Sequence, residues 1–273
     1  MRGFETGRYR YVAALLVASM AVLIDGCVTA VRPWGADATL RPGMQRLRDA
    51  AHDAATSPRV WVPLVGAALL QVNNWDRKVS DWARRETPLF GSQQNAADWS
   101  DRLRTASSVS YFTTVVLAPG ADEPGEWLHY KAQGFLVGLG AISATGLATA
   151  ELKSATGRTR PNGQGTLSFP SGHASHSAVT TGLARDNLPS FDLDDGSRRA
   201  LDMGLDALSA ATAWARVEAG AHFPADGLAG IALGNFLSRF VDESFLEPAT
   251  GRGVAWALVP SQDGVELQWT LRY

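Results

Sequence analysis

Apolar residues recur at helical spacing along most of this chain. An amphipathic helix is predicted over residues 42–56. An apolar helix is predicted over residues 59–72, where Pro63 is compatible with a first helical turn. The remaining helical patterns cover residues 75–86, 94–116, 173–185, 199–218 and 224–242. Helical segments therefore dominate the chain as far as residue 242.

The most apolar internal segment is residues 134–150, which carries no charge over 17 residues. Its four glycines allow neighbouring helices to approach closely. The segment has two interpretations, a membrane span or a buried central helix. We favour the buried helix, because no other segment after residue 30 is apolar for the length that a span requires.

The C-terminal pattern changes from helical to period two. Residues 265–273 alternate apolar and polar side chains, and a Pro-Ser-Gln-Asp-Gly turn separates them from the apolar residues 254–259. Alternation beside an Asp-Gly pair predicts a β-hairpin. A single hairpin needs a partner surface, so we expect it to pack on the helices or to pair with another chain.

The N-terminal pattern is typical of a targeting segment. Three arginines precede residues 11–24, an uncharged run of 14 residues that suits a signal-peptide core. Cys27 follows in a context that resembles a bacterial lipoprotein processing site, although Asp25 departs from the usual residue. Lipidation at Cys27, ordinary cleavage near Ala30 and an uncleaved anchor are three alternatives. Each of them predicts an exported, periplasmic or cell-envelope protein.

Composition narrows the classes of function. The chain has 273 residues, of which 45% are hydrophobic and 19% charged, and its formal net charge is -2. It has no basic excess that would favour nucleic acid. Cys27 is the only cysteine, which excludes an intrachain disulfide framework and a cysteine-rich zinc site.

Three polar segments are candidates for chemistry. The first is residues 153–161, where Lys153, Arg158 and Arg160 lie among small residues. Such a segment either binds an anion or forms a solvated surface.

The second segment is Pro170-Ser171-Gly172-His173, a turn that opens a helix. Free N–H groups at a helix N-terminus bind phosphate-like anions, and a histidine at that place can donate a proton. The alternative is that Ser171 only caps the helix and that His173 is a surface residue.

The third segment contains Arg216, His222 and Asp226. Gly220 indicates the end of one helix and Pro224 the first turn of the next, so His222 lies in a tight connection. Asp226 is four residues further on and can reach the imidazole. A carboxylate on one ring nitrogen leaves the other free as a nucleophile. The alternative is a capping aspartate beside a surface histidine.

Together these segments resemble the type 2 phosphatidic acid phosphatase and vanadium haloperoxidase superfamily. Its signature is K-x6-R-P, then P-S-G-H, then S-R-x5-H-x3-D. Ten specified positions match in order and spacing, namely Lys153, Arg160, Pro161, Pro170, Ser171, Gly172, His173, Arg216, His222 and Asp226. One position departs, because Ala215 stands where the signature has serine. His176 and Arg158 lie outside the signature, and we expect His176 on a polar helix face.

The resemblance implies a site and a mechanism. His222 would attack phosphorus, Asp226 would orient His222, and His173 would protonate the leaving group and then activate water. The phosphoryl oxygens would be bound by Lys153, Arg160, Arg216 and the N–H groups around Ser171 and Gly172. This arrangement needs no metal and no cofactor, and phosphoryl transfer by positioning and charge stabilisation fits it.

The resemblance also implies an all-α helical bundle, here with the β-hairpin appended. We divide the chain into a signal segment (1–27), a linker with an amphipathic helix (28–58), a helical phosphatase domain (59–245) and the hairpin (250–273). We expect an exported domain, tethered to a membrane by its N-terminus. Nine tryptophans fit a core better than an acyl groove or a membrane-facing surface.

The expected activity is metal-independent hydrolysis of phosphate monoesters or pyrophosphates, with lipid phosphates among the candidate substrates. Two alternatives are a vanadate-dependent haloperoxidase, which uses the same residues, and a non-catalytic phosphate-binding envelope lipoprotein. The sequence does not identify the leaving group or the oligomeric state.

Overall fold

The computed structural model describes residues 33–246 with their side chains, and the backbone of residues 253–261 and 264–272. Cys27 and the rest of the predicted signal segment, 1–27, lie outside the described residues. The lipoprotein, cleavage and anchor alternatives therefore stay predictions.

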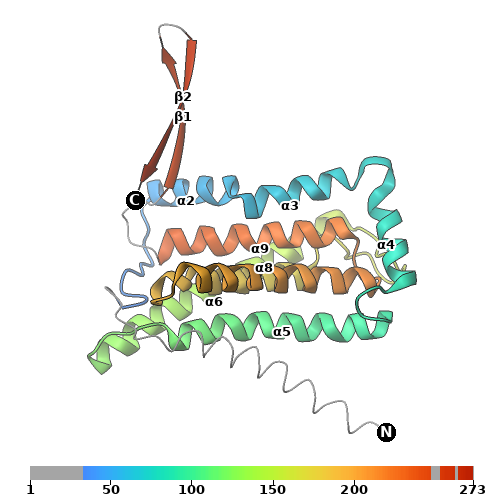
Figure 1. Cartoon of the computed structure of the whole chain (residues 1–273), viewed down its shortest axis with the longest axis horizontal. Helices are drawn as coiled ribbons and strands as arrows, with labels where there is room; N and C mark the ends of the chain where they lie inside the picture. The colour runs from blue at the N-terminus through green and yellow to red at the C-terminus, as the bar shows by residue number, and fades with distance from the viewer. Residues whose placement is uncertain (1–32, 247–252, 262–263, 273) are drawn as a thin grey trace.

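The described chain is a bundle of helices followed by two strands (Figure 1). The elements are α2 (Met44–Thr56), α3 (Pro58–Leu69), η1 (Val72–Asn74), α4 (Trp75–Glu86), α5 (Gln93–Leu117), α6 (Pro124–Thr156), α7 (Gly172–Asp186), η2 (Leu188–Ser190), α8 (Asp195–Glu218), α9 (Pro224–Phe245), β1 (Gly253–Ser261) and β2 (Gly264–Arg272). Figure 1 shows α5, α8, α9 and α3 running along the long axis, with α4 across one end. The expected all-α bundle is confirmed.

Helix α7 is the centre of the bundle and packs against α5, α6, α8 and α9. Its side chains are small, and they are buried from Ser177 through Ala184. A β-carbon at Gly230 of α9 would lie 2.6 Å from the Ser171 carbonyl oxygen, and one at Gly234 would lie 2.4 Å from that of Ser175. Only glycine allows this approach, which fixes the N-terminus of α7 against the first turns of α9.

Helix α6 corrects the expected buried central helix. It is the one helix among the described residues that is long and apolar enough to cross a membrane, yet only 28% of its most apolar 18-residue window is buried. Leu136 is 60% exposed and Leu147 is 70% exposed. The sequence pattern identified an apolar helix but could not show that one side faces outward.

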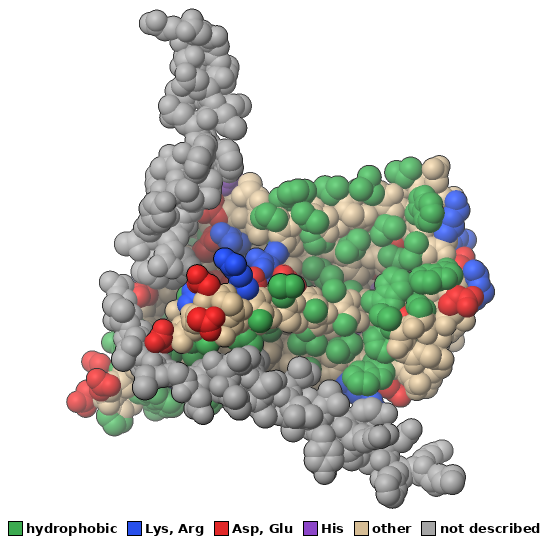
Figure 2. All heavy atoms as spheres, viewed as in Figure 1, with side chains coloured by type: hydrophobic (Ala, Val, Ile, Leu, Met, Phe, Trp, Pro, Cys, Tyr) green, Lys and Arg blue, Asp and Glu red, His purple; other side chains and the backbone are tan. Residues whose placement is uncertain are grey.

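Other large apolar side chains are also exposed. Figure 2 shows hydrophobic side chains spread over the middle of the viewed face, with charged groups at its right-hand edge and in its left-hand third. Trp61, Trp75 and Trp82 are 48%, 52% and 45% exposed. The expectation that these tryptophans belong to the core is wrong, because α3 and α4 present them on the outside of the bundle.

The strands β1 and β2 pair antiparallel, with Gly253 opposite Arg272 and Ser261 opposite Gly264. The two strands form a sheet with each other (Figure 1). The partner surface of the hairpin stays a prediction, as do the domain boundaries drawn from the sequence.

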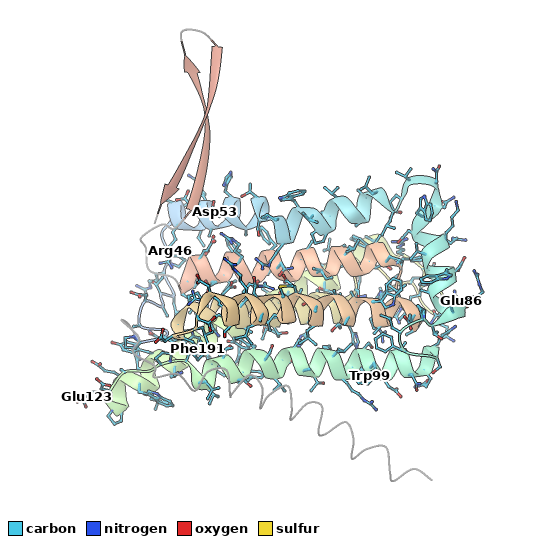
Figure 3. All side chains as sticks on the ribbon, in the orientation of Figure 1. Arg46, Asp53, Glu86, Trp99, Glu123 and Phe191 are labelled. Atoms are coloured by element: carbon cyan, nitrogen blue, oxygen red, sulfur yellow. The ribbon has the colours of Figure 1, made fainter. Side chains whose placement is uncertain are left out.

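The three candidate segments lie at one end of the bundle, opposite the end that contains α2 (Figure 3). At the end near α2, Arg46 donates a hydrogen bond from Nε to the carbonyl oxygen of Glu243, 2.8 Å away. At the other end, Trp99 marks the part of α5 that lies near α4. The C-termini of α6 and α8 and the N-termini of α7 and α9 meet at that end, where Ser171 N–H donates to the Asp226 carbonyl oxygen at 2.9 Å. All three candidate segments therefore converge.

Candidate active site

His222 lies in the connection between α8 and α9, as the sequence indicated, and is 2% exposed. Gly220 ends the preceding helix with a positive φ of 68°, and Pro224 opens α9. The Nδ1 atom of His222 is 2.6 Å from the Ser168 carbonyl oxygen. A carbonyl can only accept, so Nδ1 must carry the proton and Nε2 keeps its lone pair.

Burial lowers the pKa of His222, and the nearby charges of Lys153 and Arg216 act in the same direction. The ring is therefore neutral near pH 7. The Nε2 atom has no hydrogen-bond partner among the described residues. A neutral imidazole with one free nitrogen beside cations is suited to attack an electrophile that carries negative charge.

Asp226 is fully buried at the start of α9 and is close to His222 without directly pairing with it. Its Oδ2 is 3.8 Å from His222 Nδ1 and accepts hydrogen bonds from Ser168 Oγ at 2.5 Å and Phe223 N–H at 2.8 Å. Burial alone would raise the pKa of Asp226, but the nearby His222 ring, the hydrogen bond from Ser168 and the charge of Arg158 lower it. The Ser168 carbonyl therefore makes the direct hydrogen bond with His222. Asp226 contributes a negative charge near the ring without bonding to it.

Arg158 joins two buried carboxylates. Its Nη1 is 2.6 Å from Asp226 Oδ1, and its Nη2 is 2.6 Å from Asp76 Oδ2. Asp76 also accepts a hydrogen bond from Ala225 N–H at 2.8 Å, and the Arg158 guanidinium stacks 4.2 Å from the Phe223 ring centroid. Arg158 is committed to this pairing, so it supports Asp226 instead of offering a free charge to an anion.

A cavity of about 280 Å³ lies beside Arg158. Its lining consists of Gln71, Asn74, Asp76, Arg77, Arg158, Thr159 and Phe223. It includes none of the histidines or motif cations. This cavity is therefore distinct from the phosphate site that the motifs predict.

His173 lies in the first turn of α7, after the cap Ser171, whose Oγ accepts a hydrogen bond from Ala174 N–H at 3.4 Å. Its Nε2 is 2.7 Å from Asp101 Oδ1 on α5. Burial, with Arg216 next, lowers the pKa of His173 to about 4, although the hydrogen bond with Asp101 acts in the opposite direction. In the free site this ring is neutral at pH 7.

Three motif cations come together around the histidines. Lys153 is in the last turn of α6 and donates from Nζ to the Leu167 carbonyl oxygen at 2.6 Å. Burial, followed by the charge of Arg160, lowers the pKa of Lys153 to about 8. The pKa of Arg216 is also lowered, by burial and then by Arg160. The contribution of Arg160 to both shifts means that the positive charges are close and that an anion between them would relieve their repulsion.

Arg216 has unused hydrogen-bonding capacity. Its Nη1 donates to Ser100 Oγ at 3.1 Å, whereas its buried Nε has no partner among the described residues. An unpaired buried donor is costly unless a ligand satisfies it. Ala215, where the signature has serine, is fully buried and contributes no hydroxyl group.

The structure shows contacts that sequence reasoning missed. The missed residues are Asp76, Ser100, Asp101 and Ser168, and the role of Arg158 was also missed. Local patterns give no signal for them, because each acts through a partner more than 50 positions away in the chain.

His176, outside the signature, is 2.9 Å from Ser108 Oγ, so its place on a polar face is in line with the expectation. No cluster of three or more metal-ligating side chains occurs among the described residues.

Comparisons with known proteins give a match to a family model and a match to a solved structure. Residues 134–243 match the family model described as the PAP2 superfamily. A crystal structure of a transmembrane PAP2 type phosphatidylglycerolphosphate phosphatase from Bacillus subtilis is 20% identical, with a TM-score of 0.48, and the match covers 70% of this chain and 94% of that one. No curated protein matches the chain. The segment that carries all ten signature residues thus matches the model of the PAP2 superfamily.

Proposed function

We propose that this chain is a metal-independent phosphatase that hydrolyses phosphate monoesters or pyrophosphates through a phosphohistidine. The observation that carries the proposal is the state of His222. Its Nδ1–H is committed to the Ser168 carbonyl at 2.6 Å, which leaves the Nε2 lone pair among motif cations. The family match supports a phosphatase, and the geometry suggests how its histidines would act.

In the proposed first step, His222 Nε2 attacks phosphorus and the bond to the leaving oxygen breaks. His173 donates its proton to that oxygen. In the second step His173 takes a proton from water, the hydroxide attacks phosphorus, and the phosphorus–nitrogen bond breaks. Lys153, Arg160 and Arg216 hold the phosphoryl oxygens, together with the N–H group of Gly172, because the transition state spreads negative charge over them. The N–H group of Ser171, which the signature also indicated, donates to the Asp226 carbonyl oxygen instead.

His173 must gain a proton before the first step, because its pKa is about 4 in the free site. Burial and the charge of Arg216 are the main causes of this low value. A bound phosphate dianion would offset the surrounding positive charge and raise the pKa of His173. The acid is thus proposed to become protonated together with substrate binding.

We further propose that the substrate is a lipid phosphate. Large apolar side chains are exposed on α3 and α6, where Leu69 is 63% exposed and Leu128 is 63% exposed. Exposed apolar surface of this extent indicates contact with another apolar surface, such as the acyl chains of a lipid.

We place the protein in the cell envelope, exported and membrane-associated, on the basis of the uncharged run at residues 11–24. Cell fractionation of the wild type and of Cys27→Ser tests this placement.

The central experiment measures phosphate release by the full chain in a mild detergent with excess chelator. The substrates are an aryl phosphate, a phosphatidate and a polyprenyl pyrophosphate. We expect release that survives chelation, disappears in His222→Ala and persists in the control His52→Ala, whose ring lies exposed on α2. A radiolabelled phosphoryl group that survives alkaline quenching but not acid would identify phosphohistidine.

Three other results would contradict the proposed function or favour an alternative. Loss of activity with chelator would contradict a metal-independent mechanism. A folded protein that binds phosphate but turns over none of the substrates would favour the binding lipoprotein. Bromide oxidation that depends on added vanadate would favour the haloperoxidase.

A further inference from the structure

One contact in the site lies outside both the family match and the signature. The Nε2 atom of His173 is 2.7 Å from Asp101 Oδ1, and Asp101 belongs to α5, which precedes residues 134–243. The preceding residue, Ser100, accepts a hydrogen bond from Arg216 at 3.1 Å. Two consecutive residues of α5 therefore touch two signature residues, one from α7 and one from α8. Through these two contacts α5 forms one side of the candidate site.

The groups facing His173 carry both signs of charge. Arg216 approaches from α8, Arg104 from α5 one turn beyond Asp101, and Asp101 is the carboxylate among them. Burial and the two guanidinium groups disfavour a proton on the ring, whereas Asp101 favours it. In return, the hydrogen bond from His173 lowers the pKa of Asp101, so the carboxylate is ionised at neutral pH.

The two ring nitrogens of His173 are in different situations. With Asp101 at Nε2, the Nδ1 atom is the nitrogen with no hydrogen-bond partner among the described residues. A protonated ring would donate Nε2–H to Asp101 and keep Nδ1–H for another acceptor. A carboxylate that holds one nitrogen in this way sets the orientation of the ring and stabilises its charged form.

We propose that Asp101 is the positioning residue of the leaving-group acid, holding His173 by Nε2 so that Nδ1 delivers the proton to the leaving oxygen. This inference rests on the proposed phosphatase function. The proton moves from His173 Nδ1 to the leaving oxygen as the phosphorus–oxygen bond breaks, and Asp101 remains a carboxylate throughout. In the second step Nδ1 recovers a proton from the attacking water.

The test compares Asp101→Asn with Asp98→Asn in the full-length protein. Asp98 is the matched control, since it lies one turn earlier on α5, accepts a hydrogen bond from Gln94 at 3.0 Å and loses the same charge. The first readout is the titration of the His173 ring by NMR, assigned with His173→Gln. It requires no turnover. Asp101→Asn should lower the pKa of His173, and Asp98→Asn should leave it unchanged.

The second readout is kcat/KM, which reports the steps up to cleavage of the ester bond, for two phosphate monoesters, one with an alkyl and one with a nitrophenyl leaving group. General acid catalysis is needed most by the poor leaving group, so Asp101→Asn should slow the alkyl ester about tenfold or more and change the nitrophenyl ester by less than about threefold. Asp101→Glu should restore part of the lost rate. In the His173→Ala background, Asp101→Asn should add no further loss.

Two results would overturn the inference. The first is a His173 titration that Asp101→Asn leaves unchanged or raises. The second is an equal loss with both leaving groups, because that pattern reports general damage to the site. If the wild type released phosphate from neither ester and from neither lipid substrate, the proposed function would fail, and the role of Asp101 in proton transfer with it. An altered titration would then still show that Asp101 controls the proton on His173.

Discussion

At the scale of single residues, Arg158 holds two carboxylates that come from different parts of the chain. Asp76 opens α4 and Asp226 opens α9, and both are nearly inaccessible to solvent. One guanidinium group bonds to each of them at 2.6 Å. Because buried carboxylates are costly without a partner, this shared cation keeps Asp226 ionised beside His222.

We predict that Arg158→Met destabilises the protein by about 2–4 kcal/mol, below the full cost of breaking a buried pair, because Arg158 is partly exposed. Removal of the cation also raises the pKa of Asp226, which weakens its support of His222. Urea denaturation followed by circular dichroism measures the loss. Arg85→Met, an exposed arginine on α4, is the control. If Arg158→Met were as stable as the control, Arg158 would not be the counter-charge of these aspartates.

At the scale of elements, the contact between α7 and α9 positions the site. It brings the cap Ser171 next to Asp226, so the helix N-terminus and His222 face the same place. The contact depends on glycine, because a β-carbon at Gly230 would be 2.6 Å from a backbone oxygen of Ser171. Backbone atoms cannot give way as a flexible side chain can, so the two helices must separate.

We therefore predict that Gly230→Ala destabilises the protein by about 1–3 kcal/mol and lowers phosphate release in the same variant. Gly140→Ala is the matched control, since a β-carbon there meets no atom within 4 Å. It replaces glycine inside helix α6 and should stabilise the protein by about 0.5–1 kcal/mol. Thermal melts of the two variants should shift in opposite directions. Equal shifts would contradict the close contact.

A second contact at this scale fixes the far end of α5. Lys131 of α6 donates from Nζ to the carbonyl oxygens of Val115, at 2.6 Å, and Ala118. Burial lowers the pKa of Lys131 to about 8. We predict that Lys131→Met costs about 1–3 kcal/mol, because it leaves buried carbonyl groups unpaired. Hydrogen exchange should show faster opening at the C-terminal turn of α5, and no change there would contradict a capping role.

At the scale of the whole molecule, three histidines in and near the site make stability depend on pH. The pKa values of His173, His176 and His222 are all lowered, in each case chiefly by burial. For such a histidine the unfolded chain binds protons at a higher pH than the folded chain does. Stability is therefore retained above the unfolded pKa and declines as pH falls toward the folded value.

We predict that the free energy of unfolding falls between about pH 6.5 and about pH 4, with at most about 3 kcal/mol from His173. The pKa of His173 drops from 6.5 to about 4 on folding, which sets this window. Chemical denaturation across the range measures the slope. His173→Gln should flatten it, whereas His52→Gln should not. An unchanged slope in His173→Gln would contradict the neutral buried ring.

Across the whole molecule, the sequence predicted the motif residues of the site but not their partners on distant helices. The order and spacing of the motifs predicted Lys153, His173, His222 and Asp226, because each of them lies in a short segment at the end of a helix. Spacing could not reveal Asp101, which reaches His173 across 72 positions. Nor could periodicity decide which side of α6 faces outward, since an apolar helix gives the same pattern in a core and on a surface.

The position of Ser100 and Asp101 has a consequence for protein engineering. A graft limited to residues 134–243 would carry all ten signature residues into a new scaffold, but it would leave behind the hydroxyl that holds Arg216 and the carboxylate that holds His173. It would also leave behind Asp76 and with it one end of the Arg158 pair. The smallest transplantable unit of this site must therefore begin before α4.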